Sequence, residues 1–216
     1  MVNLTDLGFS KNVIIETIVA TYDSEGYPNA APIGAKMTDE QHLAIKPYNS
    51  SSTLKNIKAG LCATVNLTSD VDLFYKTAFK EANPSGITPQ EWFEKAESID
   101  APRLRSADAV IGITVKEISP LDAKRTSVVC KVSFIEAKSS LPKGYCRAFP
   151  ATIEAIIHAT RIKALANEKS SEEHLNKLVE LINNCDETVN RTAPNSRYSE
   201  IMTEIKSKIG LWRAQK

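Results

Sequence analysis

The stretch around which the fold is organised reads Pro47-Tyr48-Asn49-Ser50-Ser51-Ser52-Thr53-Leu54-Lys55-Asn56-Ile57. Its four consecutive hydroxyl residues, 50–53, lie between an apolar run and a helix that we expect to begin near Leu54. Ser and Thr are favoured helix caps, so an ordinary capping loop is one interpretation, and the segment alone favours it. The other interpretation is an anion site, because unpaired N–H groups and the helix dipole attract a phosphate there, and Lys55 adds a cation.

The composition is that of an ordinary soluble globular protein, with 42% hydrophobic and 25% charged residues in a chain of 216. The 27 basic and 26 acidic residues nearly balance, which argues against a nucleic-acid-binding protein. The N-terminus lacks the features of a signal peptide, and no apolar run approaches the ~20 residues that span a membrane. We expect a cytoplasmic, reduced protein, because no zinc-type or CxxC spacing joins the four cysteines, Cys62, Cys130, Cys146 and Cys185.

The first strands are expected to form a hairpin. Residues 13–21 are rich in β-branched side chains and end in a turn, and residues 29–37 form the second strand. This second strand consists of small residues and contains Pro32 and Gly34. Proline belongs at a strand edge, and a strand glycine often marks close approach by a ligand or another backbone. A simple irregular edge strand is the alternative.

Further along, we expect strands at residues 42–46 and 61–67, with Gly60 stopping the helix between them. The polar Asn66 lies in the apolar run 61–67 and needs partners if it is buried, either as a structural hydrogen-bonder or as a ligand contact. Residues 70–100 are a helix-prone insertion, in which Thr88 caps a second helix. Strands resume at residues 109–115 and 127–135.

Two arginines precede these later strands. Arg103 and Arg105 occupy alternate positions, so on an extended segment they share one face. That face would meet either a phosphate or an acidic neighbour.

From residue 149 onward the pattern is helical, with helices expected over residues 152–165, 175–182 and 201–209 and a turn within 183–194. Strands first and helices after favour an α+β fold built on an antiparallel barrel or sandwich. We therefore expect a strand domain at 1–148 with the insertion near 70–100. We expect a C-terminal helical domain at 149–216 that packs on the barrel through its apolar stripes.

One helix face of this C-terminal region carries three ionisable residues, Glu154, His158 and Arg161. A metal site needs more ligands than these offer. We interpret them as a buried ion-pair stripe that docks the helix.

Four segments keep a characteristic order: Glu16-Thr17-Ile18-Val19-Ala20-Thr21; Pro28-Asn29-Ala30-Ala31-Pro32-Ile33-Gly34; Ser51-Ser52-Thr53-Leu54-Lys55-Asn56-Ile57 with Val65-Asn66; and Ile153-Glu154-Ala155-Ile156-Ile157-His158-Ala159-Thr160-Arg161. The first 70 residues resemble the FMN-binding split-barrel superfamily of flavin reductases and pyridoxamine-phosphate-oxidase-like proteins. The whole chain resembles, more narrowly, the archaeal flavoprotein family of domain of unknown function 447.

The resemblance implies an antiparallel split β-barrel and a homodimer with FMN at its interface. The small-residue strand would run along the flavin ring and offer backbone groups from Ala31, Pro32, Ile33, Gly34 and Ala35. The hydroxyl loop would bind the phosphate, so the implied cofactor contacts there are Tyr48, Ser50, Ser51, Ser52 and Thr53. Asn56 and Asn66 would be secondary contacts to the ribityl chain or the ring.

No pattern in the sequence identifies catalytic residues. A nucleophilic triad, a Rossmann glycine motif and a Walker loop are all missing from it. A flavin carries hydride and electron chemistry itself, so this does not exclude an enzyme. Two functions stay open: an FMN-dependent oxidoreductase resembling flavin reductases, and a non-catalytic module that stores, senses or delivers FMN.

Overall fold

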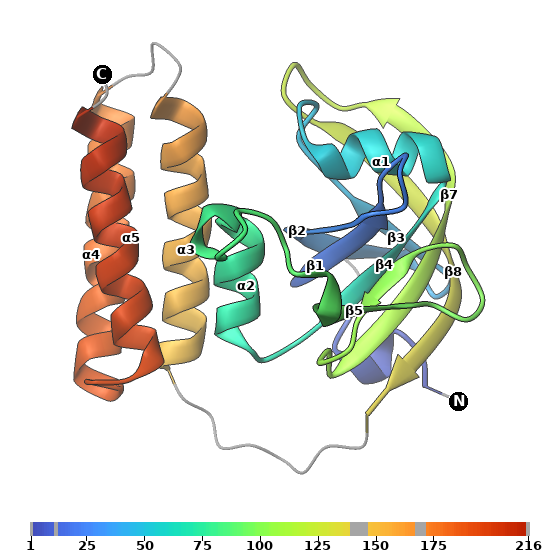
Figure 1. Ribbon diagram of the computed structural model, residues 1–216, viewed down its shortest axis with the longest axis horizontal. Helices are drawn as coiled ribbons and strands as arrows, with labels where there is room; N and C mark the ends of the chain where they lie inside the picture. Colours follow the sequence, from blue (N-terminus) through green and yellow to red (C-terminus); the bar gives the residue numbers. More distant parts are fainter. Residues whose placement is uncertain (1, 11–12, 139–146, 167–171, 215–216) are drawn as a thin grey trace. The chain divides into compact units, whose positions relative to one another are not determined.

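The first part of the chain folds into a closed six-stranded antiparallel barrel (Figure 1). The computed structural model describes residues 2–10, 13–138, 147–166 and 172–214. Around the barrel the strand order is β1-β2-β3-β8-β7-β4, and every neighbouring pair is antiparallel. The strands are β1 (Ile14–Tyr22), β2 (Pro28–Asp39), β3 (His42–Ile45), β4 (Cys62–Leu67), β7 (Ala109–Pro120) and β8 (Thr126–Ala137). The expected antiparallel barrel is confirmed.

Helix α1 (Ser52–Gly60) packs on the barrel strands β1, β2 and β4. Leu54 and Ile57 of this helix belong to the same buried apolar core as the inward side chains of the strands. The helix ends one residue later than predicted. Gly60 is its last residue, and Leu61 takes the left-handed conformation that closes it, with φ 54°.

A small two-stranded sheet, β5 (Phe93–Lys95) paired with β6 (Pro102–Leu104), follows in the chain. The second helix predicted from Thr88 is wrong. Only a single 3-10 turn, η3 (Gln90–Trp92), forms there, and no side chain caps it. The cause is tertiary: Phe93 is buried and pairs with Leu104 across the small sheet, which overrides the local helix-start signal.

The chain divides into two compact units: Met1–Ser69 with Phe79–Leu141, and Asp70–Ala78 with Pro142–Lys216. The second unit contains α2 (Val71–Ala78), α3 (Ala148–Ala166), α4 (Glu172–Thr192) and α5 (Arg197–Ala214), in which α3 packs against all three other helices (Figure 1). Helix α4 continues through most of the stretch where we predicted a turn. The sequence-based domain boundary at residues 148 and 149 stays a prediction.

The interpretation of Glu154, His158 and Arg161 as a buried ion-pair stripe is wrong. The Glu154 side chain is 61% exposed, and its carboxylate lies 3.9 Å from His158 Nε2. Arg161 is also exposed, and only the imidazole is largely covered. Burial, followed by the charge of Arg161, lowers the pKa of His158. The two long charged side chains reach solvent from the helix surface, as such side chains commonly do.

The described cysteines, Cys62, Cys130 and Cys185, are free thiols. Cys130 lies in the barrel core, where burial raises the pKa of its thiol to about 12, so it packs as a small apolar residue. Within the described ranges, no cluster of three or more His, Cys, Asp or Glu residues is placed to hold a metal ion. None of the helices in those ranges combines the length and the apolar character that crossing a membrane requires.

An ion-pair network joins α2 to α5 and makes the helical unit sensitive to acid. Arg197 contacts Asp72 and Glu204, each at 2.8 Å, and Lys76 contacts Asp72 at 2.6 Å. Burial raises the pKa of Asp72, but hydrogen bonds from Lys76 and Arg197 outweigh burial and leave it lowered. Burial likewise opposes hydrogen bonds from Tyr75 and Arg197 at Glu204, and its pKa is also lowered.

A lowered carboxylate pKa contributes stability that is present above the unfolded-state pKa and is lost as the pH falls through the folded-state value. We therefore expect the thermal midpoint, followed by helical circular dichroism, to fall as the pH drops from about 5 to about 3. Asp72→Asn should flatten this dependence, whereas Glu187→Gln, at an exposed position on α4, should leave it unchanged. An unaltered slope in Asp72→Asn would contradict the assignment.

Candidate functional site

Strand β2 has an open edge. It pairs with β1 from Pro28 to Lys36, but β3 pairs with it only from Ala35 onward. Residues 28–34 therefore lack a partner strand on their second side among the strands that the structure describes. The Asp23 N–H donates to the Tyr27 carbonyl at 3.0 Å where the hairpin begins.

Antiparallel alternation from that hydrogen bond turns the backbone groups of Ala30, Pro32 and Gly34 toward the open edge. The hydroxyl of Thr17, which donates to the Ile33 carbonyl at 2.7 Å, agrees with this alternation, because that carbonyl faces β1. Proline has no N–H. Pro28 alternates in the same way, so the edge offers four carbonyls and two N–H groups.

Most side chains along this edge are small, and the exception, Ile33, packs against the barrel core. Ala31, Pro32, Ile33 and Gly34 are half-buried, and Ala35 is buried where β3 begins to pair. The close approach at Gly34 is to a side chain of β1, because an added Cβ would lie 2.6 Å from Ile14 Cγ2. Gly34 is thus explained by its own strand neighbour.

The hydroxyl loop divides into residues with different roles. Ser51 caps α1: its Oγ accepts the Leu54 N–H at 3.2 Å and donates to the Tyr48 carbonyl at 2.7 Å. Ser50 and Ser52 are exposed, whereas Thr53 is only 1% exposed. The capping interpretation therefore describes Ser51, but it does not account for Thr53.

The hairpin between β7 and β8 holds the loop in place. Asn49 donates its N–H to the Lys124 carbonyl at 2.8 Å and accepts the Thr126 hydroxyl at 2.6 Å. Tyr48 forms a β-bridge with Arg125, whose guanidinium lies 5.0 Å from the centre of the phenol ring. Tyr48 is thus placed beside the hydroxyl loop by a rigid neighbour.

A partly buried polar cluster lies beside the first turn of α1, and it consists of Thr21, Asn29, Thr53, Asn56 and Lys80. Asn56 Nδ2 donates to Thr21 Oγ1 at 3.0 Å, and Asn29 Nδ2 donates to Thr53 Oγ1 at 3.3 Å. The Lys80 ammonium, from the 3-10 turn η2 (Lys80–Ala82), donates to Asn29 Oδ1. Burial lowers the pKa of Lys80. Neither Asn29 nor Lys80 is predicted as a site residue from the sequence, because no local motif marks either one.

Asn66 lies elsewhere and supports the small sheet. Its Oδ1 accepts the Leu104 N–H at 3.0 Å, and its Nδ2 donates to the Ile18 carbonyl at 2.9 Å and to Thr64 Oγ1 at 3.0 Å. Each polar atom of this amide is therefore engaged within the chain. These bonds favour the structural role for Asn66, whereas Asn56 lies beside the hydroxyl loop.

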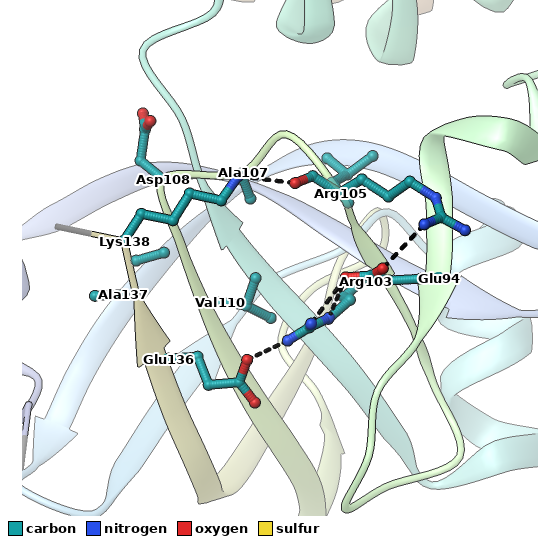
Figure 2. Close-up of a pocket in the computed structure, with 11 residues that line it drawn as sticks. Glu94, Arg103, Arg105, Ala107, Asp108, Val110, Glu136, Ala137 and Lys138 are labelled. Carbon is teal, nitrogen blue, oxygen red and sulfur yellow. Dashed lines mark hydrogen bonds and ion pairs between the residues drawn. The ribbon is translucent and has the colours of Figure 1, made fainter. Parts of the chain in front are cut away.

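A charged pocket of about 220 Å³ lies between β6 and the ends of β7 and β8 (Figure 2). Arg103 contacts both Glu94 and Glu136, and Arg105 Nη1 contacts Glu94 Oε2 at 3.1 Å. Lys138 Nζ donates to the Arg105 carbonyl at 2.8 Å. The two arginines thus face acidic neighbours. The volume is below the ~300 Å³ at which small-molecule sites begin.

Two family models match almost the whole chain. Residues 15–140 match the N-terminal domain of the family described as protein of unknown function (DUF447). Residues 146–206 match the second DUF447 model.

Solved structures are also similar. One is an FMN-bound protein from Methanosarcina mazei, at 23% identity and a TM-score of 0.75, covering 94% of this chain and 98% of that chain. Another is an FMN-binding protein from Thermus thermophilus with bound 1-cyclohex-2-enone, at 12% identity and a TM-score of 0.50, covering 61% and 75%. These likenesses show a shared fold.

Proposed function

This chain belongs to the DUF447 family, and we propose that it binds FMN along the open edge of β2, with the phosphate beside the first turn of α1. The observation that carries the proposal is the open edge, where residues 28–34 have no second partner among the described strands. The FMN-bound protein from Methanosarcina mazei supports it, because the two chains share their fold over nearly their full lengths.

The residues at the edge fit a flat, polar-rimmed ring. The small side chains of Ala31 and Pro32 let a ring approach the backbone closely, whereas Ile33 packs against the barrel core and Gly34 faces Ile14. Carbonyls and N–H groups that alternate along the edge match the acceptors and donors of a flavin. Ala35 closes this stretch, because pairing with β3 begins there.

The loop fits the phosphate end. The first N–H groups of α1 and its dipole favour an anion, and Ser50, Ser52 and Thr53 add hydroxyls around it. We assign Ser51 to the cap and Tyr48 to the wall of the site. The side-chain amide of Asn56 donates to Thr21 through its Nδ2. We assign its Oδ1, which no hydrogen bond of the described residues engages, to accept a ribityl hydroxyl.

We propose an FMN-dependent oxidoreductase, in which FMN supplies the hydride and electron chemistry when it is bound. The chain's own residues bind and orient the cofactor: the β2 backbone holds the ring edge, and the α1 turn holds the anion. We further propose a homodimer with FMN at its interface, because a lone protomer leaves FMN at the open edge of β2 uncovered and a second copy would cover it.

The test begins with apo protein titrated with FMN and followed by visible absorbance and sedimentation. We expect one FMN per 23.7 kDa chain and twice that mass for the particle. A stable monomer with full FMN occupancy would rule out the homodimer.

The loaded protein then receives NADH, NADPH or a reduced deazaflavin without oxygen. Bleaching at a catalytic rate supports the oxidoreductase. Bound FMN that none of these donors reduces overturns the oxidoreductase and leaves a carrier or sensor of FMN. Protein that takes up no FMN overturns both.

A further inference from the structure

We propose that Lys80, coupled through Asn29 to Thr53, is the cation that recognises the flavin phosphate and makes the site prefer FMN over riboflavin. This inference rests on the proposed function and names the group that decides its specificity. Lys80 takes the role that the sequence suggested for Lys55, the cation closest in sequence to the hydroxyl loop, because Lys55 is exposed on α1.

Lys80 carries a positive charge that no acidic side chain of the described residues neutralises. The Lys80 side chain is half-buried, and burial lowers the pKa of its ammonium group. Across the described ranges its hydrogen bond goes to the neutral Asn29 amide, and no carboxylate forms an ion pair with it. A cation that is partly removed from water without a counter-charge is costly, so an anion that arrived beside it would be strongly stabilised.

The hydrogen bonds that join Lys80, Asn29 and Thr53 run in a defined direction. An ammonium group only donates, so Asn29 presents its Oδ1 to Lys80 and its Nδ2 to Thr53. Thr53 Oγ1 is therefore the acceptor in that contact. Its own proton has no acceptor among the hydrogen bonds of the described residues, although Thr53 is only 1% exposed. Two of the three ammonium protons of Lys80 likewise have no acceptor among the hydrogen bonds of the described residues.

The donors of this cluster indicate the chemical class of the ligand. The Thr53 hydroxyl and the Lys80 ammonium belong to one hydrogen-bonded cluster at the first turn of α1, and each keeps a proton that it can donate. Their complement is a group with negative charge and several acceptor oxygens, which describes a phosphate monoester. The alternative cations, Arg103 and Arg105, already pair with Glu94 and Glu136.

The experiment compares affinities for FMN and riboflavin, measured by fluorescence titration of the apo protein. Lys80→Met should weaken FMN binding at least about tenfold, since a hydrogen bond to a charged group is lost. Riboflavin, which has no phosphate, should change less than about twofold. The matched control is Lys58→Met, an exposed lysine in the last turn of α1, which should alter neither affinity.

A second variant keeps the test decisive if Lys80→Met does not fold. Asn29→Asp retains the lysine and supplies it with an internal counter-charge, so FMN should weaken by a similar factor while riboflavin is spared. If either folded variant keeps the wild-type ratio of the two affinities, the inference is overturned and FMN binding still stands. If the wild-type protein binds neither flavin, the proposed function itself falls.

Discussion

Replacing Asn66 by alanine is expected to lower the free energy of unfolding of the barrel unit by about 3 kcal/mol. The side chain is 0% exposed and makes four hydrogen bonds. One joins β4 to β1, one joins β4 to β6, and two are to Thr64 on β4 itself. Alanine would leave the Leu104 N–H and the Ile18 carbonyl buried without this partner. Each such group costs about 1–3 kcal/mol, and the vacated volume adds a cavity term.

Urea unfolding followed by tryptophan fluorescence measures this change, because Trp92 is hydrogen-bonded to Arg105 next to the small sheet. The matched control is Asn190→Ala, an exposed asparagine on α4 whose amide contacts Asp186 at 3.0 Å. It should stay within about 0.5 kcal/mol of the wild type. A comparably small effect at Asn66 would show that its hydrogen bonds contribute little.

The same variant separates support from ligand contact. If Asn66 only holds the small sheet, folded Asn66→Ala protein should keep its FMN affinity within about twofold. A tenfold loss, about 1.4 kcal/mol, would instead place the amide against the cofactor. The structure favours the first outcome, because every polar atom of this side chain is already engaged.

The barrel could be predicted because short stretches of the sequence are enough to indicate its strands. Runs of β-branched or small residues are bounded by turns, and strand alternation follows from them. The small sheet could not be predicted. Each of its strands has three residues, and they are held by partners distant in sequence: the Thr64 hydroxyl, for example, donates to the Pro102 carbonyl at 2.6 Å. A helix-start signal at Thr88 carries no information about that contact.

The candidate site could also be predicted only in part. A run of hydroxyls before a helix indicates an anion site or a cap by its residue types alone. The cap is observed at Ser51, and the anion site stays a proposal. Ser51 caps the helix, and Thr53 turns toward the partly buried cluster. The sequence could not distinguish the two, because the distinction depends on Asn29 and Lys80. They reach Thr53 only through the β1–β2 register and the path of the chain after α2.

Gly112 is the second position where a small change should have a large effect. It pairs with Phe134 across β7 and β8, and an added Cβ would lie 2.1 Å from Cε1 of that ring. The aromatic ring therefore lies directly over the glycine, at the point where the strand register shifts between Gly112 and Ile113. Alanine would push the ring off its half-buried position, and overpacking of this kind costs about 1–3 kcal/mol.

Gly112→Ala is thus expected to destabilise the barrel by about 2 kcal/mol in urea unfolding. The opposite sign is expected for Gly210→Ala on α5, where an added Cβ meets nothing within 4 Å and helix propensity favours alanine by about 1 kcal/mol. The ring is tested by repeating Gly112→Ala in a Phe134→Ala background. There the substitution should be neutral or stabilising, because the clash has gone and alanine restricts the unfolded chain. An equal loss in both backgrounds would show that backbone conformation at Gly112, and not the Phe134 ring, excludes a side chain.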